Sequence, residues 1–187
     1  MKSQNTVKLA IAGLLIAIGL IIPMFSPVKI LLEPASFTLA SHAAIFIAMF
    51  ISPVVAVAVA AGTTIGFFFG GFPIIVVLRA STHIVFAFAG SLYLRKISKG
   101  KLSAVKLRIF SFYIAVAHAV GELAVVSIFY FGGNLSAIHF EKGFFMSVLL
   151  LVGLGTIVHS MVDFEIAQII LYPLKKQKPL GVLLEKC

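Results

Sequence analysis

Four pairs of polar side chains interrupt an otherwise apolar sequence, and their types could bind a small anion or relay protons. The pairs are Ser41 with His42, Arg79 with His83, His118 with Glu122, and His159 with Asp163. In the last three pairs the residues are four positions apart, so on a helix they share one face. An arginine with nearby imidazoles suits a carboxylate ligand, whereas histidine–carboxylate pairs are typical of metal sites or proton relays.

Arg79 is the most informative of these residues because its surroundings are almost wholly apolar. It lies within residues 71–94 of a chain that is 61% hydrophobic and 11% charged. A charged side chain at the centre of a membrane helix costs about 2.5–3.5 kcal/mol on insertion scales, so it needs a partner and indicates a functional site. Two partners are open at this stage: the carboxylate of a bound ligand, or Glu122 of the protein itself.

A candidate binding site for a small carboxylate follows from the depth expected for these residues. Both the Ser41 pair and the Arg79 pair are predicted in the outer third of the membrane, with His139 in the loop above. The candidate substrate-binding residues are Arg79, His83, His42, Ser41, Asn134 and Glu122. The alternative for each histidine is a hydrogen bond between helices without contact to a ligand.

The two histidine–carboxylate pairs are predicted to lie at different depths. Glu122 is expected near the middle of the membrane, where it could complete the binding pocket. Asp163 is expected nearer the cytoplasmic side, as a structural pair neutralised by His159. No metal is expected, because the chain has neither a His-Glu-x-x-His segment nor a three-ligand set. An intramembrane enzyme would instead require the four residues of these pairs to converge within hydrogen-bond reach.

The elements that position these residues must be membrane helices. With 187 residues, 61% of them hydrophobic, and a mean hydropathy of +1.15, the chain is too apolar for a soluble domain. A span takes about 20 apolar residues, so this length accommodates about five to seven helices and no soluble domain of any size. We therefore expect one integral membrane domain over residues 1–187, of the all-α class.

The positive charge marks the cytoplasmic side and does not indicate a nucleic-acid surface. The net charge of +9 is concentrated at the amino end, in one central loop and in the tail. These basic residues are Lys2, Lys8, Arg95, Lys96, Lys99, Lys101, Lys106, Arg108, Lys175, Lys176, Lys178 and Lys186. Such segments stay cytoplasmic by the positive-inside rule, which leaves Lys29 and Lys142, each beside a glutamate, for the outer face. Both termini are then cytoplasmic, and the number of spans must be even.

The apolar runs predict six membrane helices. They cover about residues 7–24, 37–51, 54–69, 74–94, 109–131 and 144–174. Outer loops are expected at residues 26–36 and 132–141, and an inner turn at Ser52-Pro53. The basic inner loop joins the fourth and fifth helices.

Small residues in the first and third helices allow close helix approach. Gly13 and Ala17 could form a groove for a partner helix, or could pack within the chain; for the alanine-rich run that ends at Gly62, packing within the chain is favoured. Cys187 is the only cysteine, so no disulfide framework is expected. No Gly-x-x-x-x-Gly-Lys-Ser/Thr motif occurs, so this chain is not expected to hydrolyse ATP itself.

Several longer stretches form recognisable motifs. They are Pro34-Ala-Ser-Phe-Thr-Leu-Ala-Ser-His42, Phe46-Ile-Ala-Met-Phe-Ile-Ser-Pro53, Gly62-Thr-Thr-Ile-Gly66, Gly71-Phe-Pro73, Leu78-Arg-Ala-Ser-Thr-His83 and His159-Ser-Met-Val-Asp163. With these motifs the chain resembles the substrate-binding S components of energy-coupling factor (ECF) vitamin transporters, in particular the niacin and pantothenate subgroups. The resemblance covers nearly the whole chain, including six expected spans, cytoplasmic termini and the basic inner loop.

This resemblance implies roles for several residues. In that family the first helix docks the transmembrane coupling subunit through an Ala-x-x-x-Ala motif; here Gly13 replaces the first alanine and Ala17 matches the second. The family's ligand pocket lies near the outer face, where Arg79, His83 and Asn134 are expected.

The resemblance also implies an overall function. The chain would be a non-enzymatic, multi-pass subunit of a bacterial cell membrane, without a cofactor. It would capture a small anionic vitamin, niacin or pantothenate, outside and deliver it inside together with one coupling subunit and two ATPase subunits. Two alternatives stay open: a standalone proton-coupled carrier in which Glu122 or Asp163 titrates, and an intramembrane histidine–carboxylate enzyme.

Overall fold

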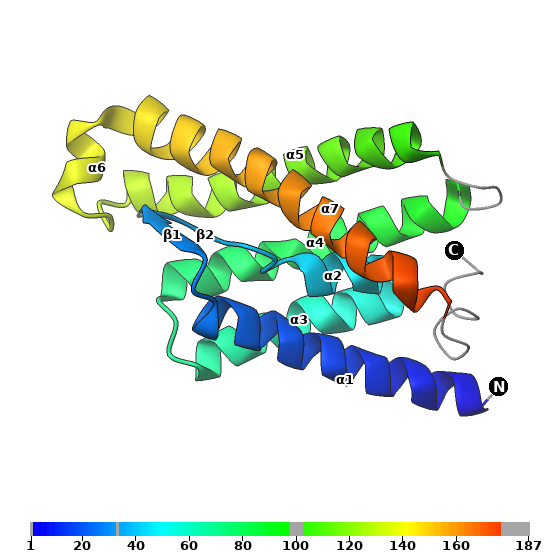
Figure 1. Cartoon of the computed structure of the whole chain (residues 1–187). Coiled ribbons are helices and arrows are strands. Elements are labelled where there is room, and N and C mark those ends of the chain that lie inside the picture. The colour runs from blue at the N-terminus through cyan, green and yellow to red at the C-terminus, as the bar shows by residue number, and fades with distance from the viewer. Residues whose placement is uncertain (1, 33, 98–102, 177–187) are drawn as a thin grey trace.

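The computed structural model describes residues 2–32, 34–97 and 103–176, and these residues are mostly helical (Figure 1). Some residues that were assigned from the sequence lie outside these ranges. These residues are Glu33, Lys99, Lys101, Lys178, Lys186 and Cys187.

Four helical runs in the described part of the chain are long and apolar enough to cross a membrane. They are α1 (Lys2–Phe25), α4 (Ile74–Ile97), α5 (Ala104–Phe131), and the continuous run of the π-helical segment η1 (Phe145–Leu154) with α7 (Gly155–Leu174). A helix satisfies its backbone hydrogen bonds internally, which hydrocarbon requires. These runs correspond to the first, fourth, fifth and sixth predicted helices, and the chain is an α-helical membrane protein.

The second and third predicted helices are shorter than a span requires. α3 (Pro53–Phe69) has 17 residues and begins with a proline at its first position. The side chain of Ser52 caps it by accepting a hydrogen bond from the Val55 amide at 3.2 Å. α2 (Ala43–Met49) has only seven residues. Helix length alone therefore does not establish the predicted count of six spans.

The prediction of a helix over residues 37–51 is wrong at its start. Residues 35–38 form strand β2 (Ala35–Thr38), which pairs in antiparallel fashion with β1 (Lys29–Leu32), with Lys29 opposite Thr38 and Leu32 opposite Ala35. The hairpin also replaces most of the loop expected at residues 26–36. The local cause is a segment rich in aromatic and hydroxyl side chains with a preceding proline, which favours a strand paired to its neighbour over a helix.

α2 is surrounded by the rest of the bundle, which explains how so short a helix is stable. Every one of its residues is buried, and Phe46 and Met49 pack in one core with Phe86 and Phe164. The Ser91 hydroxyl donates a hydrogen bond of 2.8 Å to the carbonyl of Met49, so the carboxyl end of the helix is not left unpaired in the core.

The elements divide between two ends of the bundle (Figure 1). The β1–β2 hairpin, α6 (Ala137–Glu141) and the α3–α4 connection lie at one end, which we call the hairpin end. The opposite end of the bundle, which we call the basic end, contains the first residues of α1 and α5 and the last residues of α4 and α7. The described residues of the basic segments that flank these helices include Arg95, Lys96, Lys106, Arg108, Lys175 and Lys176.

α1 lies at the edge of the bundle beside α3 (Figure 1). The small residues of α3 serve this contact: a Cβ on Gly62 would collide with Ile16, and one on Gly66 would collide with Leu20. Packing within the chain, favoured for Gly62, is therefore observed. Gly13 and Ala17 lie on the exposed side of α1, and a Cβ on Gly13 would meet no described atom within 4 Å.

Candidate functional site

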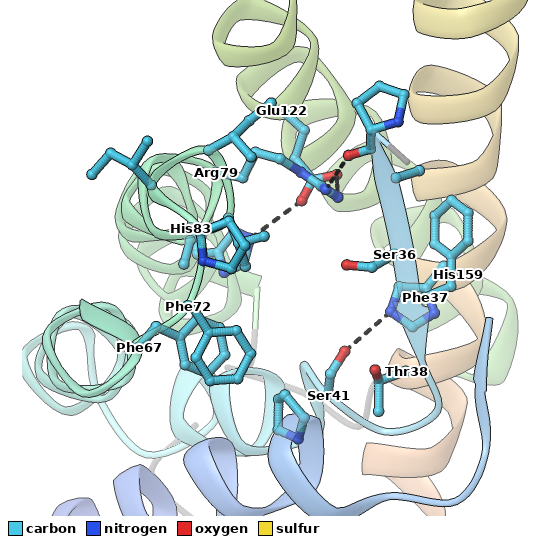
Figure 2. Close-up of a pocket in the computed structure, with 18 of the residues that line it drawn as sticks. Ser36, Phe37, Thr38, Ser41, Phe67, Phe72, Arg79, His83, Glu122 and His159 are labelled. Carbon is cyan, nitrogen blue, oxygen red and sulfur yellow. Dashed lines mark hydrogen bonds and ion pairs between the residues drawn. The ribbon is translucent and has the colours of Figure 1, made fainter. Parts of the chain in front are cut away.

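A cavity of about 560 Å³ opens at the hairpin end. All six residues predicted to bind substrate line it, together with His139. Figure 2 shows how they surround the space: Arg79 and Glu122 lie on one side, Ser41 on the opposite side, and the hairpin residues Ser36 and Thr38 form a third wall. The hairpin thus folds back over the cavity, and it brings residues far apart in the sequence to one site.

Arg79 is buried in the cavity wall, with only 5% of its surface exposed. Its Nη2 donates to Glu122 Oε2 at 2.9 Å, and its Nη1 donates to the carbonyl oxygen of Pro34 at 2.8 Å. Its Nε has no hydrogen-bond partner among the described residues. Of the two partners that the sequence left open, Glu122 is therefore present, and at least one guanidinium donor remains free.

Glu122 is held by four side chains from three helices. Besides Arg79, Thr156 donates to its Oε2 at 2.6 Å. Its Oε1 lies 3.4 Å from His118 Nε2 and 3.7 Å from His83 Nε2. These contacts fix the carboxylate, which in turn fixes the orientation of the guanidinium fork at the cavity.

The charges that line the cavity favour an anionic ligand. Among the described lining residues, Lys29 and Arg79 are cationic, and Glu122 is acidic but already paired with Arg79; the carboxylate of Asp163 lies just behind the wall, against His42. Little water reaches Arg79 in this wall. A carboxylate that enters can therefore make charge-assisted hydrogen bonds, which are stronger there than in bulk water.

Aromatic side chains form the apolar part of the cavity. Phe67 and Phe72 stack with their ring centroids 4.5 Å apart, and both face the space (Figure 2). Phe37 stands across from them beside His159, with centroids 5.4 Å apart. A Cβ on Gly155 would overlap the Phe37 ring, so this glycine is needed for the ring to lie against α7. Because Ser36 and Thr38 point into the cavity, the Phe37 ring between them points toward α7, and a flat aromatic ligand would find ring faces on the side of Phe67 and Phe72.

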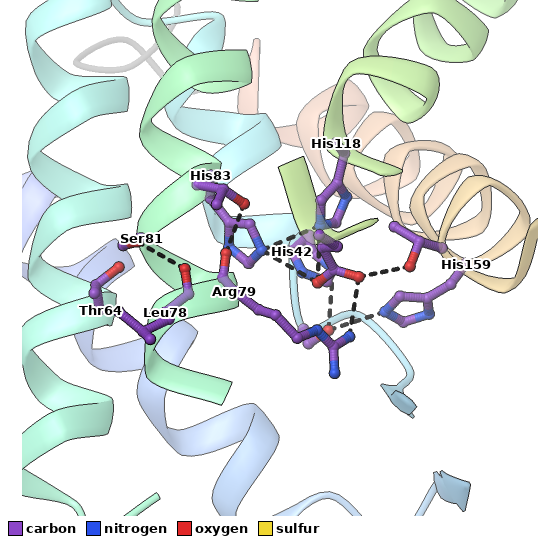
Figure 3. Close-up of polar contacts among 12 residues, drawn as sticks. His42, Thr64, Leu78, Arg79, Ser81, His83, His118 and His159 are labelled. Carbon is purple, nitrogen blue, oxygen red and sulfur yellow. Dashed lines mark hydrogen bonds and ion pairs between the residues drawn. The ribbon is translucent and has the colours of Figure 1, made fainter. Parts of the chain in front are cut away.

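Four histidines gather at the inner wall of the cavity, around His42 (Figure 3). The centroid of the His42 ring lies 4.8 Å from that of His83, 4.6 Å from that of His118 and 5.1 Å from that of His159. His83 Nε2 and His118 Nε2 are 3.1 Å apart. Sequence reasoning treated these rings as separate pairs, and only the fold brings them together.

The prediction that the two histidine–carboxylate pairs lie at different depths is wrong. His118 with Glu122 and His159 with Asp163 form pairs at 3.4 and 3.3 Å, and His42 contacts both groups. The cause is twofold. His42 precedes a helix that begins inside the bundle, and His159 lies near the middle of the 30-residue run of η1 and α7. The two pairs are thus neighbours through the His42 ring, but no hydrogen bond recorded for the described residues joins one pair directly to the other.

The remaining predicted residues lie at the rim. Asn134 is exposed, and its side chain donates to the carbonyl of Gly132 at 3.0 Å. His139 is buried nearby in α6, and its carbonyl accepts a hydrogen bond from Ser147 at 2.9 Å. Both line the cavity without contacting Arg79 through any hydrogen bond recorded for the described residues.

Sequence reasoning missed several lining residues. Lys29 was assigned only to the outer face, because its segment carries no sequence pattern that predicts a β-hairpin folded over a cavity. His159 was assigned to a structural pair nearer the cytoplasm. Phe72 had a recognisable signal: Gly71, with φ of 74°, allows the tight turn before Pro73, and this turn brings Phe72 back onto Phe67.

The fold and the site together define an α-helical membrane protein with a buried, cationic, aromatic-walled cavity open at one end. A curated relative specifies the family. The niacin transporter NiaX of Lactococcus lactis subsp. cremoris (strain MG1363) is 41% identical over 167 residues, which are 89% of this chain and 73% of the relative. No protein-family model matches the chain, and no solved structure matches it.

The chain belongs to the niacin subgroup of the substrate-binding S components of ECF vitamin transporters. It is a multi-pass protein of the cell membrane that serves vitamin uptake. The relative is a transporter, which argues against the enzyme interpretation despite the converging histidines.

Proposed function

We propose that this chain binds niacin at the hairpin end of the bundle and passes it inward as one subunit of an ECF importer. One observation carries the proposal: the guanidinium of Arg79 lines a cavity of about 560 Å³, and only two of its five N–H groups make hydrogen bonds recorded for the described residues. The 41% identity to a niacin transporter supports the choice of ligand. Niacin is a pyridine ring with one carboxylate, which matches an aromatic wall and a cationic side chain on the same cavity.

In this binding mode the niacin carboxylate accepts hydrogen bonds from Arg79 and is attracted by Lys29. The pyridine ring lies against the stacked pair of Phe67 and Phe72. Asn134 and His139 at the rim are placed to contact the ligand on entry. Charge-assisted bonds fix the orientation, while ring burial supplies most of the affinity.

The hairpin end faces the cell exterior in this proposal, and the chain makes six passes. The described basic residues at the basic end outnumber those at the hairpin end, where Lys29 and Lys142 lie, so the positive-inside rule places the basic end in the cytoplasm. The hairpin with α2 and the 17-residue α3 then supply the second and third passes. α2 is shielded from lipid by neighbouring helices, so it need not span the bilayer alone.

The exposed side of α1 is the surface proposed to dock a transmembrane coupling subunit. Gly13 and Ala17 lie there with open space above Gly13, so another helix could approach closely. Two ATPase subunits bound to that partner would supply the energy, since this chain carries no phosphate-binding motif of the Gly-x-x-x-x-Gly-Lys-Ser/Thr type.

Binding of radiolabelled niacin to the purified protein tests the proposal. We expect saturable binding with one site per chain, competition by unlabelled niacin, and much weaker competition by pantothenate. Binding of pantothenate in preference to niacin would refute the ligand assignment. Uptake into cells should require co-expression of a coupling subunit with its ATPases; uptake by this chain alone, driven by a proton gradient, would instead establish the standalone carrier.

A further inference from the structure

Four side chains at the inner wall of the cavity direct their polar atoms at one point; we call Ser41, His42, His159 and Asp163 the inner cluster. Ser41 Oγ lies 3.1 Å from His42 Nδ1, 3.1 Å from His159 Nε2 and 3.3 Å from Asp163 Oδ2. Asp163 Oδ2 lies 3.0 Å from His42 Nδ1 and 3.3 Å from His159 Nε2. Five of the six distances among these atoms are therefore nearly equal.

This arrangement is not a proton relay of the serine–histidine–aspartate kind. In such a relay one ring nitrogen faces the hydroxyl and the other faces the carboxylate. Here the same nitrogen does both: His42 Nδ1 contacts Ser41 Oγ and Asp163 Oδ2, and so does His159 Nε2. Both ring nitrogens lie over the edge that joins Ser41 Oγ to Asp163 Oδ2, so the four atoms form a compact cluster and not the links of a chain.

Two-centre hydrogen bonds alone do not account for these contacts, because both imidazole N–H groups would have to be shared between two acceptors. Ser41 Oγ, His42 Nδ1 and His159 Nε2 carry at most one proton each, and an ionised carboxylate carries none. Three protons must then serve five contacts of 3.0–3.3 Å. In addition, Asp163 Oδ2 already accepts the His42 backbone N–H at 2.9 Å. A cation at the centre would use all four lone pairs at once.

We propose that the inner cluster binds a divalent transition-metal ion of the zinc class. Zinc bonds of about 2.0–2.2 Å place the ligand atoms of a tetrahedral site roughly 3.3–3.5 Å apart, slightly wider than the observed spacing. Two imidazoles with oxygen ligands suit Zn²⁺, whereas Mg²⁺ and Ca²⁺ require oxygen ligands almost alone. The weakly bound Ser41 hydroxyl is the ligand that a water molecule or a solute could replace.

The surroundings of Asp163 fit a metal ligand. This carboxylate is fully buried, and the ion pairs of the described residues give it imidazole partners only, so a metal ion would supply the missing positive charge. Its Oδ1 accepts the Ala40 amide at 2.7 Å. Ala40 has φ of 66°, a left-handed conformation rare for alanine, which turns this amide onto the carboxylate. Such outer hydrogen bonds orient metal ligands.

The cavity gives an ion access to the site, since Ser41, His42 and His159 all line it. His42, His83 and His118 form a second possible ligand group, with their ligand atoms within 4.8 Å of one another. That group is the weaker candidate, because it contains no carboxylate to balance the charge of the ion, whereas the inner cluster contains Asp163. The inference departs from the sequence-based expectation of no metal, which considered only residues close in sequence.

Metal binding by the full-length protein, purified without a polyhistidine tag and stripped with a chelator, tests the proposal. We expect one equivalent of Zn²⁺ to rebind, and Co²⁺ to give the strong visible absorption of a four-coordinate site. His159→Gln should weaken Zn²⁺ binding by at least about 100-fold, because outer partners alone already contribute 10- to 100-fold. The matched control is His139→Gln, which replaces another buried cavity histidine outside the cluster. This variant should bind Zn²⁺ as tightly as the unaltered protein does.

Three results would overturn the proposal. They are failure of the unaltered protein to rebind Zn²⁺, unchanged affinity in His159→Gln, and loss of binding in His83→Gln with retention in His159→Gln. If His159→Gln does not fold, X-ray absorption of the unaltered zinc protein decides: two imidazoles in a four-coordinate nitrogen–oxygen shell are expected, and a six-coordinate or sulfur-containing shell refutes the site. Niacin binding by the stripped protein is measured separately, so a failed metal site does not count against the proposed function.

Discussion

Replacement of Arg79 is the most direct test of how the cavity binds a carboxylate. Arg79→Ala removes the cation that faces the cavity and leaves Glu122 buried without its strongest partner. Both changes act against an anionic ligand, because the remaining carboxylate repels it. Arg79→Lys restores the charge but not the planar fork that contacts Glu122 and Pro34 at the same time, so we expect only partial recovery.

The expected size of the effect follows from the burial of the pair. Arg79 and Glu122 have side-chain exposures of 6% and 5%, and their charged atoms are 2.9 Å apart. Truncating one member of a buried, hydrogen-bonded charge pair between a protein and its ligand typically costs about 2–5 kcal/mol in binding, and in the proposed complex that pair is Arg79 with the niacin carboxylate. At about 1.4 kcal/mol per tenfold change, niacin affinity should fall about 30-fold to several thousand-fold.

The assay is isothermal titration of niacin into purified protein, with thermal unfolding measured on the same samples. Arg108→Gln is the matched control. Its side chain is 72% exposed and lies 3.8 Å from Glu165, so it should change niacin affinity by less than about twofold.

A double variant separates ligand binding from a purely structural role. Arg79→Gln with Glu122→Gln removes both charges, so much of the stability lost in Arg79→Gln alone should return, because no uncompensated charge stays buried. Niacin binding should not return. If the double variant binds niacin within about threefold of the unaltered protein, Arg79 serves only to balance Glu122, and the carboxylate-binding role is refuted.

Three further predictions concern selectivity, stability and docking. Nicotinamide should bind about 10- to 150-fold more weakly than niacin, since a bond to a charged group is worth about 1.5–3 kcal/mol. Thr156→Val should lower the free energy of unfolding by about 1–3 kcal/mol, because it removes a buried donor 2.6 Å from Glu122. Gly13→Leu should prevent co-purification with a coupling subunit and leave niacin affinity unchanged, because its position faces open space.

Each of these has a control and a contradicting result. Equal titration curves for nicotinamide and niacin would show that the carboxylate is not recognised. Thr64→Val, whose hydroxyl contacts only its own helix at Ala60, should unfold almost as the unaltered protein does; an equal loss in both threonine variants would contradict the role given to Thr156. The control for Gly13→Leu is Ala89→Leu, which places the same side chain at an exposed position of α4. If Ala89→Leu also failed to co-purify with the coupling subunit, the loss in Gly13→Leu would reflect a general folding defect and not a docking site.

The long helices could be predicted from the sequence because each is a continuous apolar run whose length is visible without tertiary information. The α2 region could not. Residues 37–51 are equally apolar, but the strand over 35–38 depends on a partner strand at 29–32, and the helix starts only at Ala43, inside the bundle. Apolar composition predicts burial in lipid or protein alike, so it does not distinguish a span from a short helix enclosed by other helices.

The candidate site divides in the same way. Arg79 and His83 could be found because a charge in an apolar helix is conspicuous by itself, and the four-residue spacing defines one face. Their surroundings could not: the Pro34 carbonyl arrives on the hairpin, and Lys29 enters the cavity through the strand pairing. The possible partner Glu122 was identified, but whether it or a ligand meets the arginine depends on helix packing across the bundle.

His42 links the two acidic groups of the site, and this gives the niacin cavity and the inner cluster a common wall. His42 Nδ1 lies 3.0 Å from Asp163 Oδ2. The opposite edge of the His42 ring faces His83 and His118, which lie near Glu122. A change in what His42 Nδ1 binds therefore reaches the groups that orient Arg79 through a single rigid ring. If a metal ion occupies the inner cluster, any factor by which it changes niacin affinity must equal the factor by which niacin changes metal affinity.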